Sequence, residues 1–188
     1  MYLKLKLLLG GLLLFPLWFL IKSNRNVHII YGDISEWLRR YHKSQIVSYK
    51  NFVWLMVVHK PFRNVLYYRI KGLSLMFSWL YKKQDTTFIS GNSIGKGLFL
   101  CHGFATTIGA KSIGENCWIN QQVTIGHANG GDPVIGNNVY IFAGAIVLGN
   151  IKIGDNAVIA AGAVVLKNVP NDCIAIGNPA QILRKDDI

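Results

Sequence analysis

Acidic residues are scarce in this 188-residue chain, which has 9 Asp and Glu against 20 Lys and Arg. The shortage falls in the first half. Residues 1–83 carry 14 basic residues but only Asp33 and Glu36, a net charge of +12, whereas residues 84–188 carry 6 basic and 7 acidic residues, a net of −1. No recognisable nucleic-acid module accompanies the positive charge, so we expect no nucleic-acid partner. An anionic membrane surface fits better, because the same half is rich in Leu, Trp and Phe.

Cysteine is also scarce. The three cysteines, Cys101, Cys117 and Cys173, are not arranged in a C-x-x-C pair, so we expect neither a metal site nor a disulfide. We expect the three cysteines to be small buried side chains of a protein in a reducing compartment. Only 15% of the residues are charged and 51% are hydrophobic, which excludes a disordered chain and allows contact with a membrane or with other subunits.

The sequence has no apolar run of the ~20 residues that a membrane-spanning helix needs. Residues 7–21 form an apolar run of 15 residues, interrupted by two glycines and by Pro16, which weaken or kink a helix. No small-residue cleavage site follows, although two lysines precede the run as in a signal peptide. We expect residues 1–22 to associate with the inner, cytoplasmic face of a membrane; a true span, a signal peptide and a buried helix remain alternatives.

Residues 23–84 have the pattern of a basic helical region. Asp33 and Glu36 have the spacing of a capping box, which predicts a helix that starts at Asp33. After Pro61 the segment continues with apolar residues on most faces and basic residues at intervals, as in amphipathic helices. Such helices suit a membrane surface, and they equally suit a cap that packs on a neighbouring domain.

From about Phe88 onward, aliphatic residues recur at every sixth position, often followed by glycine. The series comprises Ile94, Leu100, Ile113, Ile119, Ile125, Ile135, Ile141, Val147, Ile153, Ile159 and Val165. Neither a helix nor a single alternating strand has this period, whereas a solenoid coil of three short strands and three turns does. Stacked coils bury apolar layers that no single repeat buries alone. The sequence therefore predicts a mainly β protein with a parallel β-helix over residues 85–188.

Four stretches of this region resemble the hexapeptide-repeat acetyltransferases, in their serine acetyltransferase-like branch. The stretches are "IGKGLFLCHGFATTIG", "INQQVTIGH", "VYIFAGAIVLGNIKIGDNAVIAAGAVVLKNVP" and "AIGNPAQI", and the resemblance covers about residues 86–185. It implies a left-handed β-helix, a homotrimer that can pair into a hexamer, and acetyl-CoA bound as co-substrate between neighbouring subunits, with no metal.

The resemblance also assigns a role to His102, which aligns with the general base of the serine acetyltransferases. An imidazole can take the proton of an acceptor hydroxyl as that hydroxyl attacks a thioester. Backbone N–H groups of the glycine-rich turns near Gly126 would stabilise the oxyanion. A lone histidine in an apolar context is otherwise more often structural, and that interpretation stays open.

The sequence departs from the serine acetyltransferases where they hold the substrate. The family has an Asp just before the base and another fifteen residues earlier; here these positions are Cys101 and Thr87, with Asp85 the nearest carboxylate to the latter. The family's long loop ends in an Arg-His pair, and the shorter loop here, "GHANGGDPVIG", has none. His127, where the family has glycine, either replaces the missing loop histidine or caps the turn.

The departures leave an acceptor pocket without fixed charge. This pocket is bordered by Thr106, Thr107, Asn120, Gln121 and Gln122.

The resemblance also indicates where the co-substrate binds. The small residues Ala143 and Ala161 match positions that leave room for the pantetheine arm. Arg184 and Lys185 are placed to meet the nucleotide phosphates, although a solvated basic tail has the same composition.

Three function classes follow. The first is an O-acetyltransferase that acts on a sugar hydroxyl in surface polysaccharide assembly, because a neutral pocket suits a sugar and a lipid-carried acceptor would explain the apolar, basic N-terminal half. The second is a serine O-acetyltransferase of cysteine biosynthesis, to which the resemblance points. The third is a non-catalytic or metal-binding β-helix, for which the coil region offers only His102 and His127 as histidine ligands.

Overall fold

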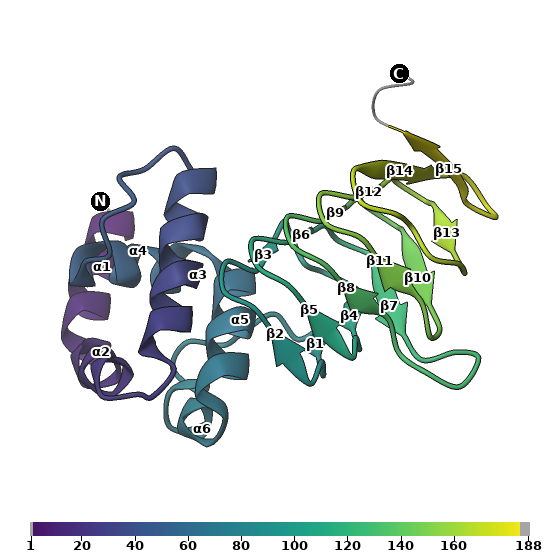
Figure 1. The fold of residues 1–188 in the computed structure, drawn as a ribbon. Helices are drawn as coiled ribbons and strands as arrows, with labels where there is room; N and C mark the ends of the chain where they lie inside the picture. Colours follow the sequence, from purple (N-terminus) through teal and green to yellow (C-terminus); the bar gives the residue numbers. More distant parts are fainter. Residues whose placement is uncertain (1, 185–188) are drawn as a thin grey trace. The chain divides into compact units, whose positions relative to one another are not determined.

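The computed structural model describes the backbone of residues 2–184 and their side chains apart from those of residues 73–75. The chain divides into two compact units, Met1–Gln84 and Asp85–Ile188. The first unit is built from helices and the second from short stacked strands (Figure 1).

The helices of the first unit are buried to different extents. They are α1 (Tyr2–Leu13), α2 (Phe15–Lys22), α3 (Val27–Arg40), α4 (Tyr49–Val58), α5 (Lys60–Ile70), the 3-10 helix η1 (Lys71–Leu73) and α6 (Ser74–Phe77). The helix α5 is buried over most of its surface, whereas α1 buries only Gly10. Ser48 caps α4 by accepting a hydrogen bond from the backbone N–H of Asn51, and α5 has Pro61 in its first turn, where no backbone donor is lost. Fully buried residues such as Trp37, Phe52 and Phe62 form the core.

The capping box expected at Asp33 is wrong. The helix α3 begins at Val27, six residues earlier, and Asp33 lies in its middle. The Asp33 side chain is only 2% exposed and accepts a 2.8 Å hydrogen bond from Nε of Arg69 on α5. Asp33 therefore pairs with an arginine 36 residues away and does not cap a helix, although its spacing to Glu36 suggests a cap.

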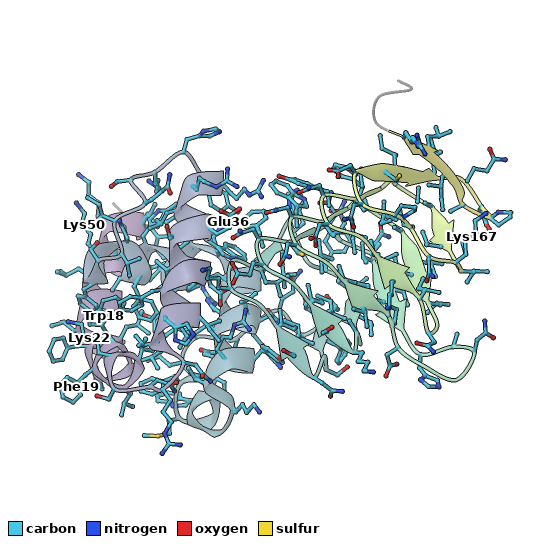
Figure 2. The ribbon with its side chains drawn as sticks, in the orientation of Figure 1. Trp18, Phe19, Lys22, Glu36, Lys50 and Lys167 are labelled. Atoms are coloured by element: carbon cyan, nitrogen blue, oxygen red, sulfur yellow. The ribbon has the colours of Figure 1, made fainter. Side chains whose placement is uncertain are left out.

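The first two helices form a bent pair. Among residues 2–184, no single helix meets the length and hydropathy requirements for crossing a membrane, and α1 and α2 meet them only when taken together, across a bend of 51°. The bend falls at Leu14, just before Pro16, which lies in the first turn of α2. Figure 2 shows Phe19 and Lys22 of α2 projecting from the surface of the helical unit, beside Trp18.

The second unit is a parallel β-helix with three sheets. Sheet A contains β1 (Thr87–Ile89), β4 (Thr106–Ile108), β7 (Thr124–Gly126), β10 (Ile146–Leu148) and β13 (Val164–Val165). Sheet B contains β2 (Ser93–Ile94), β5 (Ser112–Ile113), β8 (Val134–Ile135) and β11 (Lys152–Ile153). Sheet C contains β3 (Phe99–Leu100), β6 (Trp118–Ile119), β9 (Tyr140–Ile141), β12 (Val158–Ile159), β14 (Cys173–Ile176) and β15 (Gln181–Arg184).

The interior of the β-helix is the six-residue series of the sequence, and this prediction is confirmed. Every member from Ile94 to Val165 is buried, with Ile119, Ile125 and Ile159 at 0% exposure. Register pairing stacks them in layers, such as Leu100 on Ile119. The sequence period did not predict the end of the unit, where β15 folds back antiparallel on β14.

Candidate active site

Each coil passes from sheet C to sheet A through a short connection, and these connections stack along one edge of the β-helix. We call this the C–A edge; it comprises residues 101–106, 120–123, 142–145 and 160–163. Backbone hydrogen bonds join successive coils there, from Gly144 N to Gln121 O at 3.1 Å and from Gly162 N to Ala143 O at 2.9 Å. Residues far apart in the sequence therefore form a continuous strip.

His102 lies on a bulge of the C–A edge. The register pairs Leu100 with Ile119 and Thr107 with Thr124. Six residues therefore lie between Leu100 and Thr107, whereas four lie between the paired positions in each of the next three coils. His102 is exposed and has φ +63°, in the left-handed region that non-glycine residues rarely adopt. The same conformation recurs in other turns of the β-helix, including Ala105 and Gln122 on the C–A edge, so it belongs to the turn geometry of the coils. No hydrogen bond or ion pair joins its ring to another residue within 2–184.

Thr87 holds the bulge from inside. Its side chain is 2% exposed, and its hydroxyl donates a 2.6 Å hydrogen bond to the carbonyl oxygen of Gly103, the residue after His102. At the position where the resemblance implies a carboxylate, this chain therefore has a neutral group that fixes the backbone of the turn.

Cys101, directly before His102, is half-buried and also neutral. Burial raises the pKa of its thiol above the ordinary value, so the thiol stays protonated near pH 7. Its backbone is fixed by a 2.8 Å hydrogen bond from its N–H to the carbonyl of Ile119. A protonated thiol provides no negative charge for an ammonium group.

Gln121, Ala143 and Ala161 lie in the three coils that follow His102 on the C–A edge. The buried Oε1 atom of Gln121 has no hydrogen-bond donor among the described residues. Ala143 is half-buried and Ala161 exposed, so each of the two coils beyond Gln121 presents a small side chain, with Phe142 (36% exposed) beside the first. With about 4.8 Å between neighbouring coils, Ala161 lies roughly 14 Å along the axis from His102.

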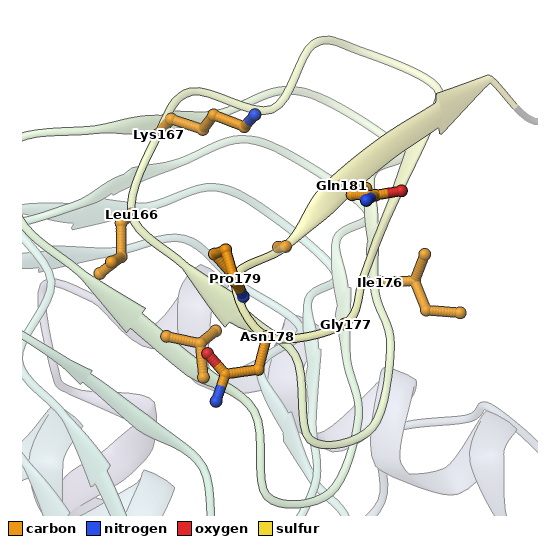
Figure 3. Close-up of a pocket in the computed structure, with 9 residues that line it drawn as sticks. Leu166, Lys167, Ile176, Gly177, Asn178, Pro179 and Gln181 are labelled. Carbon is orange, nitrogen blue, oxygen red and sulfur yellow. The ribbon is translucent and has the colours of Figure 1, made fainter.

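A pocket of about 680 Å³ lies at the C-terminal end of the β-helix. Its lining residues are Val164, Leu166, Lys167, Ile176, Gly177, Asn178, Pro179, Ala180 and Gln181. Figure 3 shows Leu166 and Pro179 on two sides of it, with Lys167 near one edge. The turn at Gly177 continues sheet A, because Val164 N donates to Gly177 O at 3.0 Å. Arg184, at the end of β15, is exposed, and Lys185 lies outside the described residues.

The other residues that the sequence predicts for the site do not lie on the C–A edge beside His102 in one chain. Gly126 is the last residue of β7 in sheet A, His127 follows it on the edge that leads to sheet B, and Asp85 is exposed ahead of β1. The His127 ring is 67% exposed, and its Nδ1 atom lies 3.1 Å from Oδ1 of Asp132 across the loop. Among the predicted polar residues, the structure brings together Cys101, His102 and Gln121 and leaves His127 on a different edge.

Both histidines of the β-helix lie in connections longer than their neighbours. Eight residues separate Ile125 from Val134, against three between Ile108 and Ser112 in the preceding coil. The sequence contained this signal: the spacing between inward aliphatic residues is eight from Leu100 to Ile108 and ten from Ile125 to Ile135, instead of six. Within residues 2–184, no group of three or more His, Cys, Asp or Glu side chains is arranged to hold a metal ion.

Comparison with known proteins links the β-helix to a transferase family. A model of the bacterial transferase hexapeptide (six repeats) matches residues 132–167. A serine acetyltransferase of Staphylococcus aureus is 37% identical over 142 residues, which cover 72% of this chain and 65% of that protein. The chain spans 42% to 65% of the length of the first curated serine acetyltransferases that it matches.

Solved structures of serine acetyltransferases have the same architecture. The soybean enzyme complexed with serine is 31% identical, with a TM-score of 0.63 over 86% of this chain and 71% of that one. A serine acetyltransferase in complex with CoA is 25% identical, with a TM-score of 0.61 over 86% of this chain and 72% of that one. These likenesses confirm the left-handed β-helix that the sequence led us to expect.

Proposed function

The chain belongs to the hexapeptide-repeat acetyltransferases, in their serine acetyltransferase-like branch, and on that premise we propose that it is an acetyl-CoA-dependent O-acetyltransferase with His102 as general base. The observation that carries the proposal is the position of His102. It is exposed on a two-residue bulge, and the small residues Ala143 and Ala161, two and three coils away on the same edge, lead toward the C-terminal pocket.

The exposed imidazole of His102 is suited to accept a proton from an acceptor hydroxyl. An alcohol is a poor nucleophile near pH 7, and a positioned base contributes about 10²–10⁴-fold to its reaction. The Thr87 hydrogen bond to Gly103 restricts the turn that carries the ring. No carboxylate among the described residues of one chain contacts the ring, so within one chain nothing but the backbone turn positions it.

The residues along the C–A edge fit acetyl-CoA. Ala143 and Ala161 leave space for a thin arm beside the backbone, and the C-terminal pocket combines apolar Leu166 with the ammonium of Lys167. An apolar wall with one cation suits the adenosine and phosphates of the nucleotide end, to which exposed Arg184 would add a second cation. Bound acetyl-CoA supplies the activated acetyl group as a thioester.

We propose that the active unit is a homotrimer. The C–A edge with His102 and the loop with His127 lie on different edges of one chain, so both can border one acceptor only if neighbouring subunits supply them. The same arrangement would bring the N–H groups near Gly126 toward the reacting carbonyl. Solution size measured with and without acetyl-CoA tests this assembly.

L-Serine is the acceptor that the relatives favour, which reverses the order that the sequence alone suggested. Every relative considered above bears the name serine acetyltransferase, and the soybean structure contains serine. We therefore propose L-serine as the first acceptor to test. A sugar hydroxyl remains the second candidate because of one observation: Thr87 and Cys101, beside His102, are both neutral.

A thiol-release assay distinguishes these acceptors. The purified protein is incubated with acetyl-CoA and either L-serine or a panel of neutral carbohydrates, and free CoA is followed over time. Saturable release with L-serine supports the serine assignment, and release only with carbohydrates supports the second candidate. If no hydroxyl acceptor of either kind stimulates release above slow hydrolysis, the O-acetyltransferase proposal is wrong.

A further inference from the structure

The first two helices expose a continuous apolar stripe. Leu5, Leu8, Leu12, Phe15 and Phe19 follow one another at intervals of three and four residues, and each is between 55% and 71% exposed. Within α1 this spacing places Leu5, Leu8 and Leu12 on one side of the helix, and within α2 it places Phe15 and Phe19 on one side. We call these five residues the apolar stripe. Soluble proteins seldom leave such a contiguous apolar surface uncovered.

The opposite side of the same helices is fixed to the unit. Leu14, Leu17 and Ile21 are at most 1% exposed, and a Cβ atom at Gly10 would lie only 2.8 Å from Val57 of α4. Because α1 packs so closely on α4, lipid cannot surround it. The pair is therefore suited to lie along a surface with one side immersed, as monotopic helices do.

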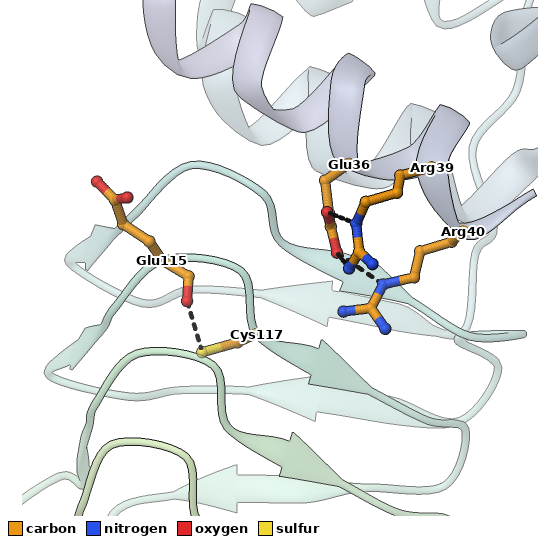
Figure 4. Close-up of polar contacts among 5 residues, drawn as sticks. All are labelled: Glu36, Arg39, Arg40, Glu115 and Cys117. Atoms are coloured by element: carbon orange, nitrogen blue, oxygen red, sulfur yellow. Dashed lines mark hydrogen bonds and ion pairs between the residues drawn. The ribbon is translucent and has the colours of Figure 1, made fainter. Parts of the chain in front are cut away.

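The charge beside the stripe is positive and is not neutralised within the unit. Asp33 pairs with Arg69, with nitrogen–oxygen distances of 2.8 and 3.2 Å. Glu36 binds Arg39 and Arg40, each at 2.6 Å (Figure 4). Burial would raise the pKa of Glu36, but the hydrogen bonds and charges of the two arginines hold it below its ordinary value, so the group stays ionised.

These two carboxylates are the only ones among residues 1–83, and three of the 14 basic residues pair with them, which leaves eleven. Of these, Lys4, Lys6, Lys22 and Arg25 are exposed on or next to α1 and α2. Lys6 lies 4.2 Å from the ring centre of Tyr2, and Lys22 lies 5.7 Å from that of Trp18. Aromatic rings with lysines beside them are typical of protein segments at the bilayer interface.

A groove beside α1 has the same mixed character. It has a volume of about 330 Å³ and is lined by Leu7, Gly11, Lys43, Tyr49, Lys50, Asn51, Val53 and Trp54. Apolar and aromatic walls with two lysines suit a molecule that has both a hydrocarbon chain and an anionic head group. A purely ionic partner such as nucleic acid would gain nothing from these walls.

We propose that the apolar stripe docks on a bilayer that contains anionic phospholipid. A second copy of this chain is the other candidate to cover the stripe, but pairing the same face twice would bring its lysines together and repel. An anionic bilayer accepts the leucines and phenylalanines into its interface and pairs with the cations at its surface. This docking is independent of the acetyltransferase proposal.

The test is sedimentation of the full chain with vesicles of phosphatidylcholine alone or of phosphatidylcholine mixed with phosphatidylglycerol. We expect stronger binding to the mixed vesicles, reduced but not abolished by salt. Leu8→Gln/Leu12→Gln should weaken binding at least tenfold, since each leucine loses its apolar burial. Lys4→Glu/Lys6→Glu should weaken binding to the mixed vesicles by about tenfold or more.

Matched controls are Ile46→Gln, which removes an apolar side chain of 71% exposure outside the stripe, and Lys111→Glu, which reverses an exposed charge in the β-helix; both should bind like the unmodified chain. Circular dichroism and the size of each variant in solution are measured in parallel. Failure of the unmodified chain to bind the mixed vesicles overturns the proposal, even if a variant does not fold. Stripe variants that bind vesicles normally but lose a subunit contact would instead assign the stripe to a second copy.

Discussion

The hydroxyl of Thr87 on β1 donates a 2.6 Å hydrogen bond to the carbonyl oxygen of Gly103, and so connects a buried side chain of β1 to the turn that carries His102. This contact fixes the turn without adding charge. Thr87 therefore supports the turn, but it does not orient the His102 ring through a charge as a carboxylate at this position could.

Replacing Thr87 with Val should destabilise the protein and lower kcat. The substitution keeps the side-chain shape and leaves a buried carbonyl without its donor, which costs about 1–3 kcal/mol. A displaced His102 turn should reduce kcat by roughly tenfold or more. Thr124→Val, on an exposed site of the same sheet, is the control. If Thr87→Val lowers the melting temperature and leaves kcat unchanged, the contact supports the fold alone.

Introducing a carboxylate at Cys101 should change acceptor preference. In Cys101→Asp, the new charge can pair with the ammonium of L-serine, so kcat/KM for serine should rise by about tenfold, while neutral carbohydrates gain nothing. Cys101→Asn has nearly the same shape and no charge. Equal serine kinetics for the Asp and Asn variants would show that the residue at this position does not contact the ammonium.

A larger side chain at Ala161 should block the co-substrate track. Ala161→Leu places three more carbons on an exposed turn of the C–A edge, where folding should tolerate them. We expect KM for acetyl-CoA to rise by roughly tenfold or more, with a smaller change in KM for the acceptor. Lys152→Leu, at an exposed position of sheet B, is the matched control. An unchanged KM for acetyl-CoA would place the co-substrate elsewhere.

The helical unit should lose stability as the pH falls from about 6.5 to about 4. Burial, assisted by the charges of Arg63 and Lys43, lowers the pKa of His59 to about 4. The unfolded chain therefore binds a proton in this range that the folded chain does not bind, and the stability present above pH 6.5 declines. His59→Phe keeps the aromatic stacking on Tyr41, which has a 4.1 Å ring separation, and should flatten the profile. A variant profile that matches the original assigns the acid sensitivity to other groups.

The β-helix could be predicted from the sequence because its period is local. Each coil repeats the same inward position, so Ile119, Ile141 and Ile159 fall in line once the six-residue spacing is recognised. The position of His102 in the site followed from the resemblance, but its bulge did not. That bulge arises from two additional residues between Leu100 and Thr107, a break in the period that the series itself contains.

Long-range pairing explains what the sequence did not predict. Asp33 has the local spacing of a cap, yet it is buried against Arg69 on another helix. The antiparallel β15 follows a turn at Asn178 and Pro179 that has no counterpart in the repeat. Likewise, His102 and His127 lie on two different edges because of the order of the sheets. The six-residue spacing of the sequence does not predict that order.

The most direct test of the account is the rate of CoA release by the unmodified protein and by His102→Asn, with the acceptor that supports the fastest turnover. Asparagine tolerates the left-handed backbone of residue 102, so the bulge should persist while the base is lost. We predict a fall in kcat of about 10²–10⁴-fold with the melting temperature and acetyl-CoA binding preserved. Turnover within about threefold of the unmodified protein would contradict the central claim that His102 is the general base.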